Sequence, residues 1–198
     1  MMERINIVML GAPGSGKGTQ AKRLAEKFNF THISTGDLFR QNISAGTPLG
    51  VEAKSYIDHG QLCPDSLTIN MLHDFLSRKE GIVGCILDGV PRTTVQADML
   101  EGRGHDKQLP ISVVINLNVD SDEISRRMLK RAEIEKRSDD TPEVIQQRIA
   151  NYLAQTKPLE EYYAQRGVLC HINGMGSMDD IFDAICRELV ARFPELAL

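Results

Sequence analysis

Short apolar runs alternate with longer amphipathic stretches along the whole chain. Five of the runs are compact and rich in Val and Ile, as strands buried in a parallel sheet should be. They span residues 4–10, 32–34, 82–88, 111–119 and 168–172. Apolar positions recur at helical spacing near residues 19–28, 37–45, 50–58, 65–76, 120–131, 142–153 and 179–193. This alternation predicts an α/β fold, a five-stranded parallel sheet with helices on both faces.

Two segments are not explained as simple connections between strands. The helical stretch 35–79, in which Asp65 is expected to cap the last helix, is too long for a plain crossover. The polar piece 132–141 interrupts two helices, and Pro158 is expected to bend the second of them. Both segments lie where mobile covers over a site would be placed. We therefore expect one domain over residues 1–198 with two insertions, at about 35–64 and about 132–141.

The composition argues against several classes of protein, among them zinc ribbons and membrane proteins. With 23 Lys and Arg against 27 Asp and Glu, the formal net charge is −4, so any anion site must be a local cluster of cations. The four cysteines lie far apart without a C-x-x-C pair, which argues against a zinc ribbon. No apolar stretch reaches membrane-spanning length, and no signal-peptide pattern is present. We expect a cytoplasmic protein with neither nucleic acid nor membrane as a partner.

A glycine-rich loop joins the first predicted strand to the first predicted helix. Its sequence is Gly11-Ala12-Pro13-Gly14-Ser15-Gly16-Lys17-Gly18-Thr19, which contains the G-x4-G-K pattern of phosphate-binding loops. Glycines let successive backbone N–H groups point at phosphate oxygens. The helix start adds the positive end of its dipole, and Lys17 adds a full charge. A plain glycine-rich turn is the alternative, but the strand before the loop and the helix after it favour phosphate binding.

Asp88 ends a predicted strand beside this loop. A carboxylate there can hold Mg²⁺ or its bound waters, and phosphate-loop proteins generally have a second acid at this position. The alternative role of Asp88 is to cap the turn at Gly89. We predict that Asp88 holds Mg²⁺ through water, which makes Mg²⁺ the expected cofactor.

Gly18 stands where the general motif has Ser or Thr, and Thr19 follows it. This form, G-x-P-G-x-G-K-G-T, resembles the adenylate kinase family, and the likeness runs through almost the whole chain. Residues 34–40, STGDLFR, look like the family's S-T-G-D-h-h-R, where h is apolar. Residues 88–92, DGVPR, resemble its D-G-F-P-R. The resemblance implies a P-loop NTPase-like fold and the reaction ATP + AMP ⇌ 2 ADP with Mg²⁺.

The resemblance also assigns roles to individual residues. It implies ATP binding by Gly14, Ser15, Gly16, Lys17, Gly18, Thr19, Arg127, Arg131 and Gly176. It implies AMP binding by Thr35, Arg40, Cys63, Gly89, Arg92, Gln96, Arg137 and Arg148. The residues it implies for catalysis are Lys17, Arg92, Arg127, Arg131, Arg137, Arg148 and Asp139. Two nucleotides bring five phosphates that repel one another, and these cations can neutralise them with forked hydrogen bonds if the fold makes them converge.

The insertions acquire functions from the same resemblance. Residues 35–64 become the segment that binds the monophosphate, and residues 132–141 become a short ATP lid, which has none of the cysteines of zinc-bearing long lids. We expect a monomer with ATP, AMP and ADP as its partners. Val90 replaces the family's Phe and is expected to loosen the packing of AMP, and Lys136 stands where Gly is common.

Three other functions stay open. A UMP/CMP kinase on the same fold is the first, but these kinases usually have Ala where Thr35 stands here, so AMP is the expected acceptor. A nucleotide-binding module without catalysis would not need the arginine set. A phosphate-loop switch or ATPase would hydrolyse ATP without an acceptor, and no switch-type segment is evident.

Overall fold

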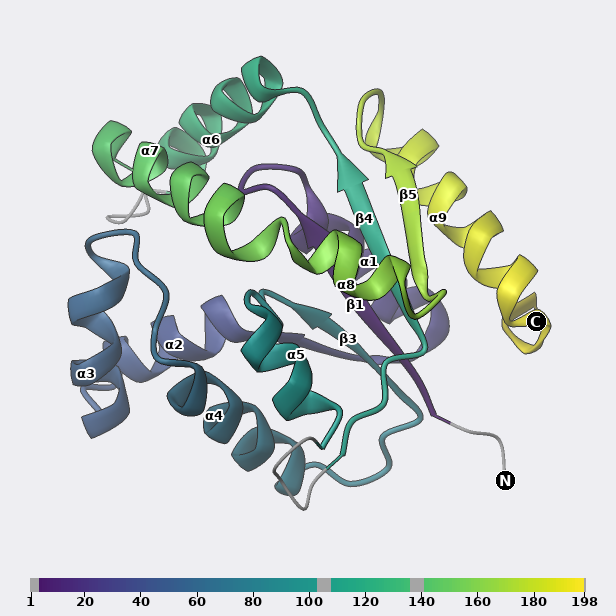
Figure 1. Cartoon of the computed structure of the whole chain (residues 1–198), viewed down its shortest axis with the longest axis horizontal. Helices are drawn as coiled ribbons and strands as arrows, with labels where there is room; N and C mark the ends of the chain where they lie inside the picture. The colour runs from purple at the N-terminus through teal and green to yellow at the C-terminus, as the bar shows by residue number, and fades with distance from the viewer. Residues whose placement is uncertain (1–3, 103–107, 136–140, 198) are drawn as a thin grey trace.

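The computed structural model describes residues 4–102, 108–135 and 141–197 of the chain. At its centre is a parallel five-stranded sheet with the order β2-β3-β1-β4-β5, which confirms the predicted fold class. The strands are β1 (Ile5–Gly11), β2 (Thr31–Ser34), β3 (Gly84–Asp88), β4 (Val113–Asn118) and β5 (Leu169–Asn173). Every residue of β1 is buried, because β1 lies mid-sheet with helices over both faces (Figure 1).

Helices separate the strands largely as the sequence pattern predicted. They are α1 (Lys17–Phe28), α2 (Thr35–Ser44), α3 (Pro48–Ile57), α4 (Asp65–Ser77), α5 (Thr94–Leu100), α6 (Ser121–Glu135), α7 (Pro142–Asn151), α8 (Leu159–Ala164) and α9 (Met178–Arg192). A π-helical turn, η1 (Tyr152–Thr156), joins α7 to α8, and a 3₁₀ turn, η2 (Pro194–Ala197), follows α9.

Some boundaries differ from those predicted. The short helix α5 was not predicted. Asp65 is the first residue of α4, not its cap, which is Pro64. The helix after Pro142 changes to η1 before Pro158. Helix α6 continues to Glu135, so the first part of the predicted lid is helical, and residues 136–140 lie outside the described residues.

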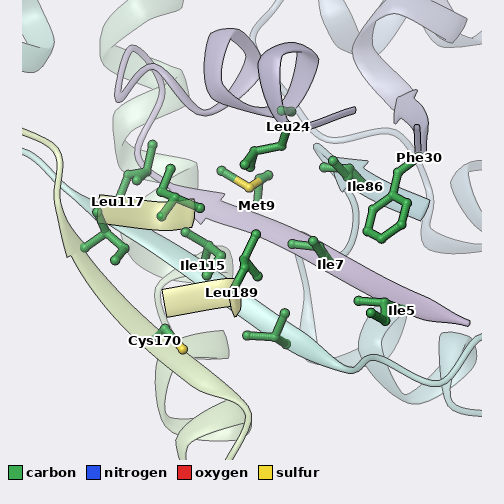
Figure 2. Packing of buried hydrophobic residues seen from close by; sticks show 14 of the residues in the cluster. Ile5, Ile7, Met9, Leu24, Phe30, Ile86, Ile115, Leu117, Cys170 and Leu189 are labelled. Carbon is green, nitrogen blue, oxygen red and sulfur yellow. The ribbon is translucent and has the colours of Figure 1, made fainter. Parts of the chain in front are cut away.

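Two apolar layers hold the helices on the sheet. On one face, Leu24 of α1 and Leu189 of α9 pack against Ile7, Met9 and other strand residues (Figure 2). The opposite face buries residues of α4, α5 and α8 against the strands, and the members with no more than 2% exposure include Val8, Leu10, Leu72, Leu100 and Tyr163. Burial of this kind stabilises the fold by roughly 25 cal/mol per Å² of apolar surface.

The carboxyl ends of the strands place the functional segments at one edge of the sheet. Met9 and Ser34 are both in register with Asp88. The glycine-rich loop after β1, the start of α2 and the turn after β3 therefore lie side by side at this edge. In open α/β sheets this edge is where ligands bind.

The first insertion has a small apolar core of its own. Phe39 of α2, Ala53 of α3, Cys63 and Met71 of α4 form a separate buried cluster. A second small cluster joins α6 to α7 through Ile124, Met128 and Ile145, with Ala12 of the glycine-rich loop against it. These clusters hold α2 and α3 on α4, and α6 on α7 and the glycine-rich loop.

Candidate active site

One cavity of about 920 Å³ opens at this edge of the sheet. Its lining includes every predicted site residue that the structure describes: Gly14, Ser15, Gly16, Lys17, Gly18, Thr19, Thr35, Arg40, Cys63, Asp88, Gly89, Arg92, Gln96, Arg127, Arg131, Arg148 and Gly176. Arg137 and Asp139 lie outside the described residues. The fold therefore brings together groups that are spread over most of the sequence.

The glycine-rich loop forms one wall of the cavity. Gly16 caps α1 with φ of 92°, a left-handed conformation that costs a residue with a side chain about 1–2 kcal/mol. Nζ of Lys17 donates to the carbonyl oxygen of Ala12 at 3.3 Å, so the lysine folds back over its own loop. The N-terminus of α1, with its partial positive charge, faces the same space.

Gly18 allows Asp88 to approach the loop closely. A Cβ atom at position 18 would lie 3.1 Å from Oδ2 of Asp88, which is tighter than ordinary van der Waals contact. A Ser or Thr here would push against the carboxylate. The departure from the general motif therefore has a steric reason, since the carboxylate of Asp88 lies against the first turn of α1.

Lys17 and Asp88 form the electrostatic centre of the cavity. Burial lowers the pKa of Lys17 to about 8, with Asp88 opposing the shift and Arg92, Arg131 and Arg148 adding to it. Burial by itself raises the pKa of Asp88, but His32, whose Nε2 lies 3.8 Å from Oδ2, and Lys17 outweigh it and hold that pKa below its usual range. The cavity thus has an excess of positive charge in place to receive phosphates.

Arg92 is held in place by hydrogen bonds of its side chain and of its backbone to other residues. Its Nε donates to the carbonyl oxygen of Gly89 at 2.9 Å, and its backbone N–H donates to Oε1 of Gln96 at 2.7 Å. Its carbonyl oxygen accepts from Oγ1 of Thr156 at 2.8 Å. Burial lowers the pKa of Arg92, yet an arginine stays charged at neutral pH. The guanidinium and Oγ1 of Thr35 both border Gly89, where an added Cβ would lie 3.1 Å from Nη2 of Arg92 and 2.7 Å from that Oγ1.

Arg127 joins three separate elements. Its Nε donates to Oε1 of Glu123 at 2.6 Å, its Nη1 to the carbonyl oxygen of Ser15 at 3.3 Å, and its Nη2 to that of Gly174 at 3.0 Å. The side chain therefore connects α6 to the glycine-rich loop and to the loop after β5. Such a cross-link fixes the spacing of the three elements that border one end of the cavity.

The other predicted site arginines that the structure describes, Arg40, Arg131 and Arg148, reach the cavity from α2, α6 and α7. Nη2 of Arg40 donates to Oδ1 of Asp37 at 2.5 Å within α2. Arg131 lies one turn after Arg127 on α6, and Arg148 lies on α7. Both line the cavity, and both are close enough to lower the pKa of Lys17.

The comparisons with known proteins agree with this geometry. The family model for adenylate kinase matches residues 9–168. An adenylate kinase of Bacteroides fragilis is 47% identical over 187 residues, covering 92% of this chain and 97% of that protein. Those of Nocardioides sp. and Thermodesulfovibrio yellowstonii are 44% and 40% identical, covering 93% of this chain and 97% and 99% of themselves.

The chain belongs to the adenylate kinase family. It is therefore a nucleoside monophosphate kinase, a phosphotransferase. Within the described residues, we find no helix with the length and apolar character that a membrane span requires.

Val90 stands in the core, at the position where the resemblance expected Phe. It is fully buried in the apolar layer beneath α4, α5 and α8 and is not part of the cavity lining. The Val90 side chain therefore does not line the cavity itself, and its expected effect on AMP packing stays a prediction. Its role is to fill the core beside the turn that contains Arg92.

Several residues that contact the site of this adenylate kinase were given no role in it by the sequence interpretation. Asp65 accepts a hydrogen bond from Gln96, and His32 lies beside Asp88. Glu123 accepts from Arg127, and Thr156 donates to the carbonyl oxygen of Arg92. Only Glu123 had a signal in the sequence, because it lies four residues before Arg127 on one helix face. The others come from distant elements, and their contacts follow from the tertiary fold alone.

Proposed function

We propose that the chain transfers the γ-phosphoryl group of ATP to AMP, reversibly, to give two ADP. The observation that supports this best is that the phosphate-binding loop and the arginines of α2, α6, α7 and the β3 turn border one continuous cavity. Phosphoryl transfer requires positioning and charge stabilisation more than covalent chemistry. A single cavity with cations at both ends meets that requirement.

Each end of the cavity receives one nucleotide. We assign the ATP phosphates to the glycine-rich loop, Lys17, Arg127 and Arg131, and its base to the region of Gly176. We assign AMP to Thr35, Arg40, Arg92 and Gln96, with Arg148 between the two phosphate groups. The backbone at Cys63 and Gly89 borders the acceptor. The thiol of Cys63 stays protonated at neutral pH, because burial raises its pKa to about 11, and it donates to the carbonyl oxygen of Ala53 at 3.9 Å.

Mg²⁺ fits the acids present. Among the described residues, no group of three or more His, Cys, Asp or Glu side chains is placed to hold a metal ion alone. Of the acids that line the cavity, Asp37 and Glu123 are bound to arginines, which leaves Asp88 to hold a metal that also takes phosphate oxygens and waters. Bound Mg²⁺ would neutralise phosphate charge, and Lys17 and the arginines complete that neutralisation.

The two insertions are proposed to cover the bound nucleotides. Residues 35–64, with α2, α3 and their own apolar core, form the segment that binds the monophosphate. Residues 132–141 form the short ATP lid, in which Arg137 and Asp139 are assigned to the closed site. Closure would exclude water from the transferring phosphoryl group and so limit ATP hydrolysis.

Because one chain lines the whole cavity, we further propose a monomer. The four free cysteines favour the reducing cytoplasm.

Acceptor specificity tests the function most directly. With ATP as donor, we expect AMP to be phosphorylated faster than UMP, CMP or GMP at equal concentration, and little ADP to form when no acceptor is present. Two adenosines joined by five phosphates should bind tightly and block the reaction. Faster turnover of UMP or CMP would instead assign the chain to the pyrimidine kinases of the same fold.

A further inference from the structure

The side-chain amide of Gln96 is bound at both ends by groups with fixed hydrogen-bonding roles. Gln96 is 2% exposed and lines the cavity. Its Oε1 accepts from the backbone N–H of Arg92 at 2.7 Å, and its Nε2 donates to Oδ1 of Asp65 at 2.9 Å. A backbone N–H only donates and a carboxylate only accepts. The amide therefore has one orientation in which both bonds form.

Asp65 acts from outside the cavity. It lies at the start of α4 and lines a separate cavity of about 390 Å³. Its Oδ1 also accepts from Oγ1 of Thr93 at 2.9 Å, and that hydroxyl oxygen accepts from the backbone N–H of Gln96 at 3.1 Å. Asp65 thus closes a ring of hydrogen bonds that links α4 to the start of α5.

The unused capacity of Gln96 determines which base edge it can bind. After its two bonds, the amide keeps one lone pair on Oε1 and one N–H on Nε2. This pair complements an amino donor beside a ring-nitrogen acceptor, as in adenine. Hypoxanthine and guanine instead present a ring N–H beside a carbonyl oxygen. To bind either of them, the amide would have to reverse.

We propose that Asp65 is a positioning residue that determines the specificity of the enzyme for AMP over IMP and GMP. The inference rests on the proposed function, because it takes Gln96 to face the acceptor base. Reversal would set the amide oxygen against the Asp65 carboxylate and the amide nitrogen against the Arg92 N–H. Because Gln96 is buried, water does not replace the lost bonds. Without Asp65, only the Arg92 N–H opposes reversal.

The test compares kcat/KM for AMP and IMP, with ATP as donor, in the wild type, Asp65→Ala and Asp65→Asn. We expect the AMP-to-IMP ratio to fall about tenfold or more in Asp65→Ala, the order of one hydrogen bond to a charged group. Asp65→Asn keeps an acceptor oxygen but can also present its NH2 group to a reversed Gln96, so its ratio should fall as well. The ratio of AMP to CMP should move little, because cytosine has the same donor–acceptor order as adenine.

Two further variants separate specificity from structure. Asp74→Asn removes the same charge from the same helix at an exposed position, where Asp74 pairs with Arg78 at 2.7 Å, and its AMP-to-IMP ratio should match the wild type. In a Gln96→Leu background, removing Asp65 should leave the ratio unchanged.

Equal losses for AMP and IMP in both Asp65 variants would overturn the proposal and leave Asp65 a role in joining α4 to α5 only. Should Asp65→Ala fail to fold, as judged by its thermal unfolding, the ratio in Asp65→Asn decides. A wild-type chain that does not phosphorylate AMP would overturn the proposed function itself, so the two failures are distinguishable.

Discussion

Lys17 shows how strongly the cavity acts on a single side chain. Burial disfavours its charged form, and three arginines add to that effect, so its pKa falls to about 8 from 10.5. Polyphosphate beside the ammonium group has the opposite effect, because an anion favours the charged form. The lysine is therefore placed to gain a proton when the donor nucleotide binds.

This difference predicts proton uptake on ATP binding in alkaline solution. Above its pKa of about 8, Lys17 of the free protein has largely lost its proton, whereas Lys17 beside bound phosphates keeps it. At about pH 9, binding should therefore take up nearly one proton. Calorimetry of a non-hydrolysable ATP analogue in two buffers of different ionisation enthalpy measures this number. The contribution of Lys17 should vanish near neutral pH, and Lys17→Met should abolish it. Unchanged uptake in Lys17→Met would assign the proton to another group.

At the residue scale, chemistry with a local signature was predictable and chemistry from tertiary contact was not. Lys17 and Arg92 stand in short motifs, so their place at the cavity could be expected. Asp65 carries no such signature, because its partner Gln96 lies 31 residues later along the chain and meets it only when α4 packs on α5. His32 likewise meets Asp88 only through the pairing of β2 with β3.

Among the elements, α6 contacts the glycine-rich loop through an apolar cluster with Ala12 and through the side chain of Arg127. Glu123 accepts from both Arg126 and Arg127, and these bonds lower its pKa to about 2. It therefore stays ionised at any working pH and holds Arg127 toward the carbonyl oxygens of Ser15 and Gly174. The link from α6 to the loop through Arg127 thus depends on the hydrogen bond between Glu123 and Arg127 within α6.

Glu123→Gln should weaken the use of ATP more than the use of AMP. Gln keeps only a neutral acceptor, so the hold on Arg127 weakens, and we expect KM for ATP to rise about 3- to 10-fold, in line with the net contribution of one ordinary hydrogen bond. KM for AMP should change less than twofold. Steady-state kinetics with each substrate varied in turn gives both values.

Asp122→Asn is the matched control for this change. Asp122 lies in the same first turn of α6 and is exposed, so the variant removes an equal charge without touching Arg127. It reports how much the loss of a nearby negative charge alone favours ATP. If both variants shift KM for ATP equally, Glu123 does not act through Arg127.

Element boundaries show the same division between local and tertiary signals. Thr141 with Pro142 predicted the start of α7, and Oγ1 of Thr141 does accept from the backbone N–H of Val144. Helix α5 was missed because seven residues are too few for a periodic pattern to stand out. Its stability comes from burial of Ala97 and Leu100 in the layer shared with α4 and α8, which the local sequence does not reveal.

Across the whole molecule, the first insertion and α7 meet at a glycine. Nδ2 of Asn151 donates to the carbonyl oxygen of Gly60 at 2.8 Å. A Cβ atom on Gly60 would lie 3.0 Å from the carbonyl oxygen of Val144 and 3.1 Å from its Cγ1. The loop of Gly60, at the end of the cavity proposed for AMP, can therefore pack on α7 only where no side chain intervenes.

Gly60→Ala should consequently raise KM for AMP and destabilise the fold, and Gly46→Ala is its natural control. Both glycines have a left-handed backbone, with φ of 67° and 64°, but a Cβ on Gly46 would meet nothing within 4 Å. Each variant should lose about 1–2 kcal/mol to backbone strain. Overpacking against Val144 should cost Gly60→Ala about 1–3 kcal/mol more, as measured by denaturant unfolding.

Because the loop of Gly60 lines the cavity, only Gly60→Ala should also weaken AMP binding. Equal stability and equal AMP kinetics in the two variants would show that the contact with α7 does not fix this end of the site.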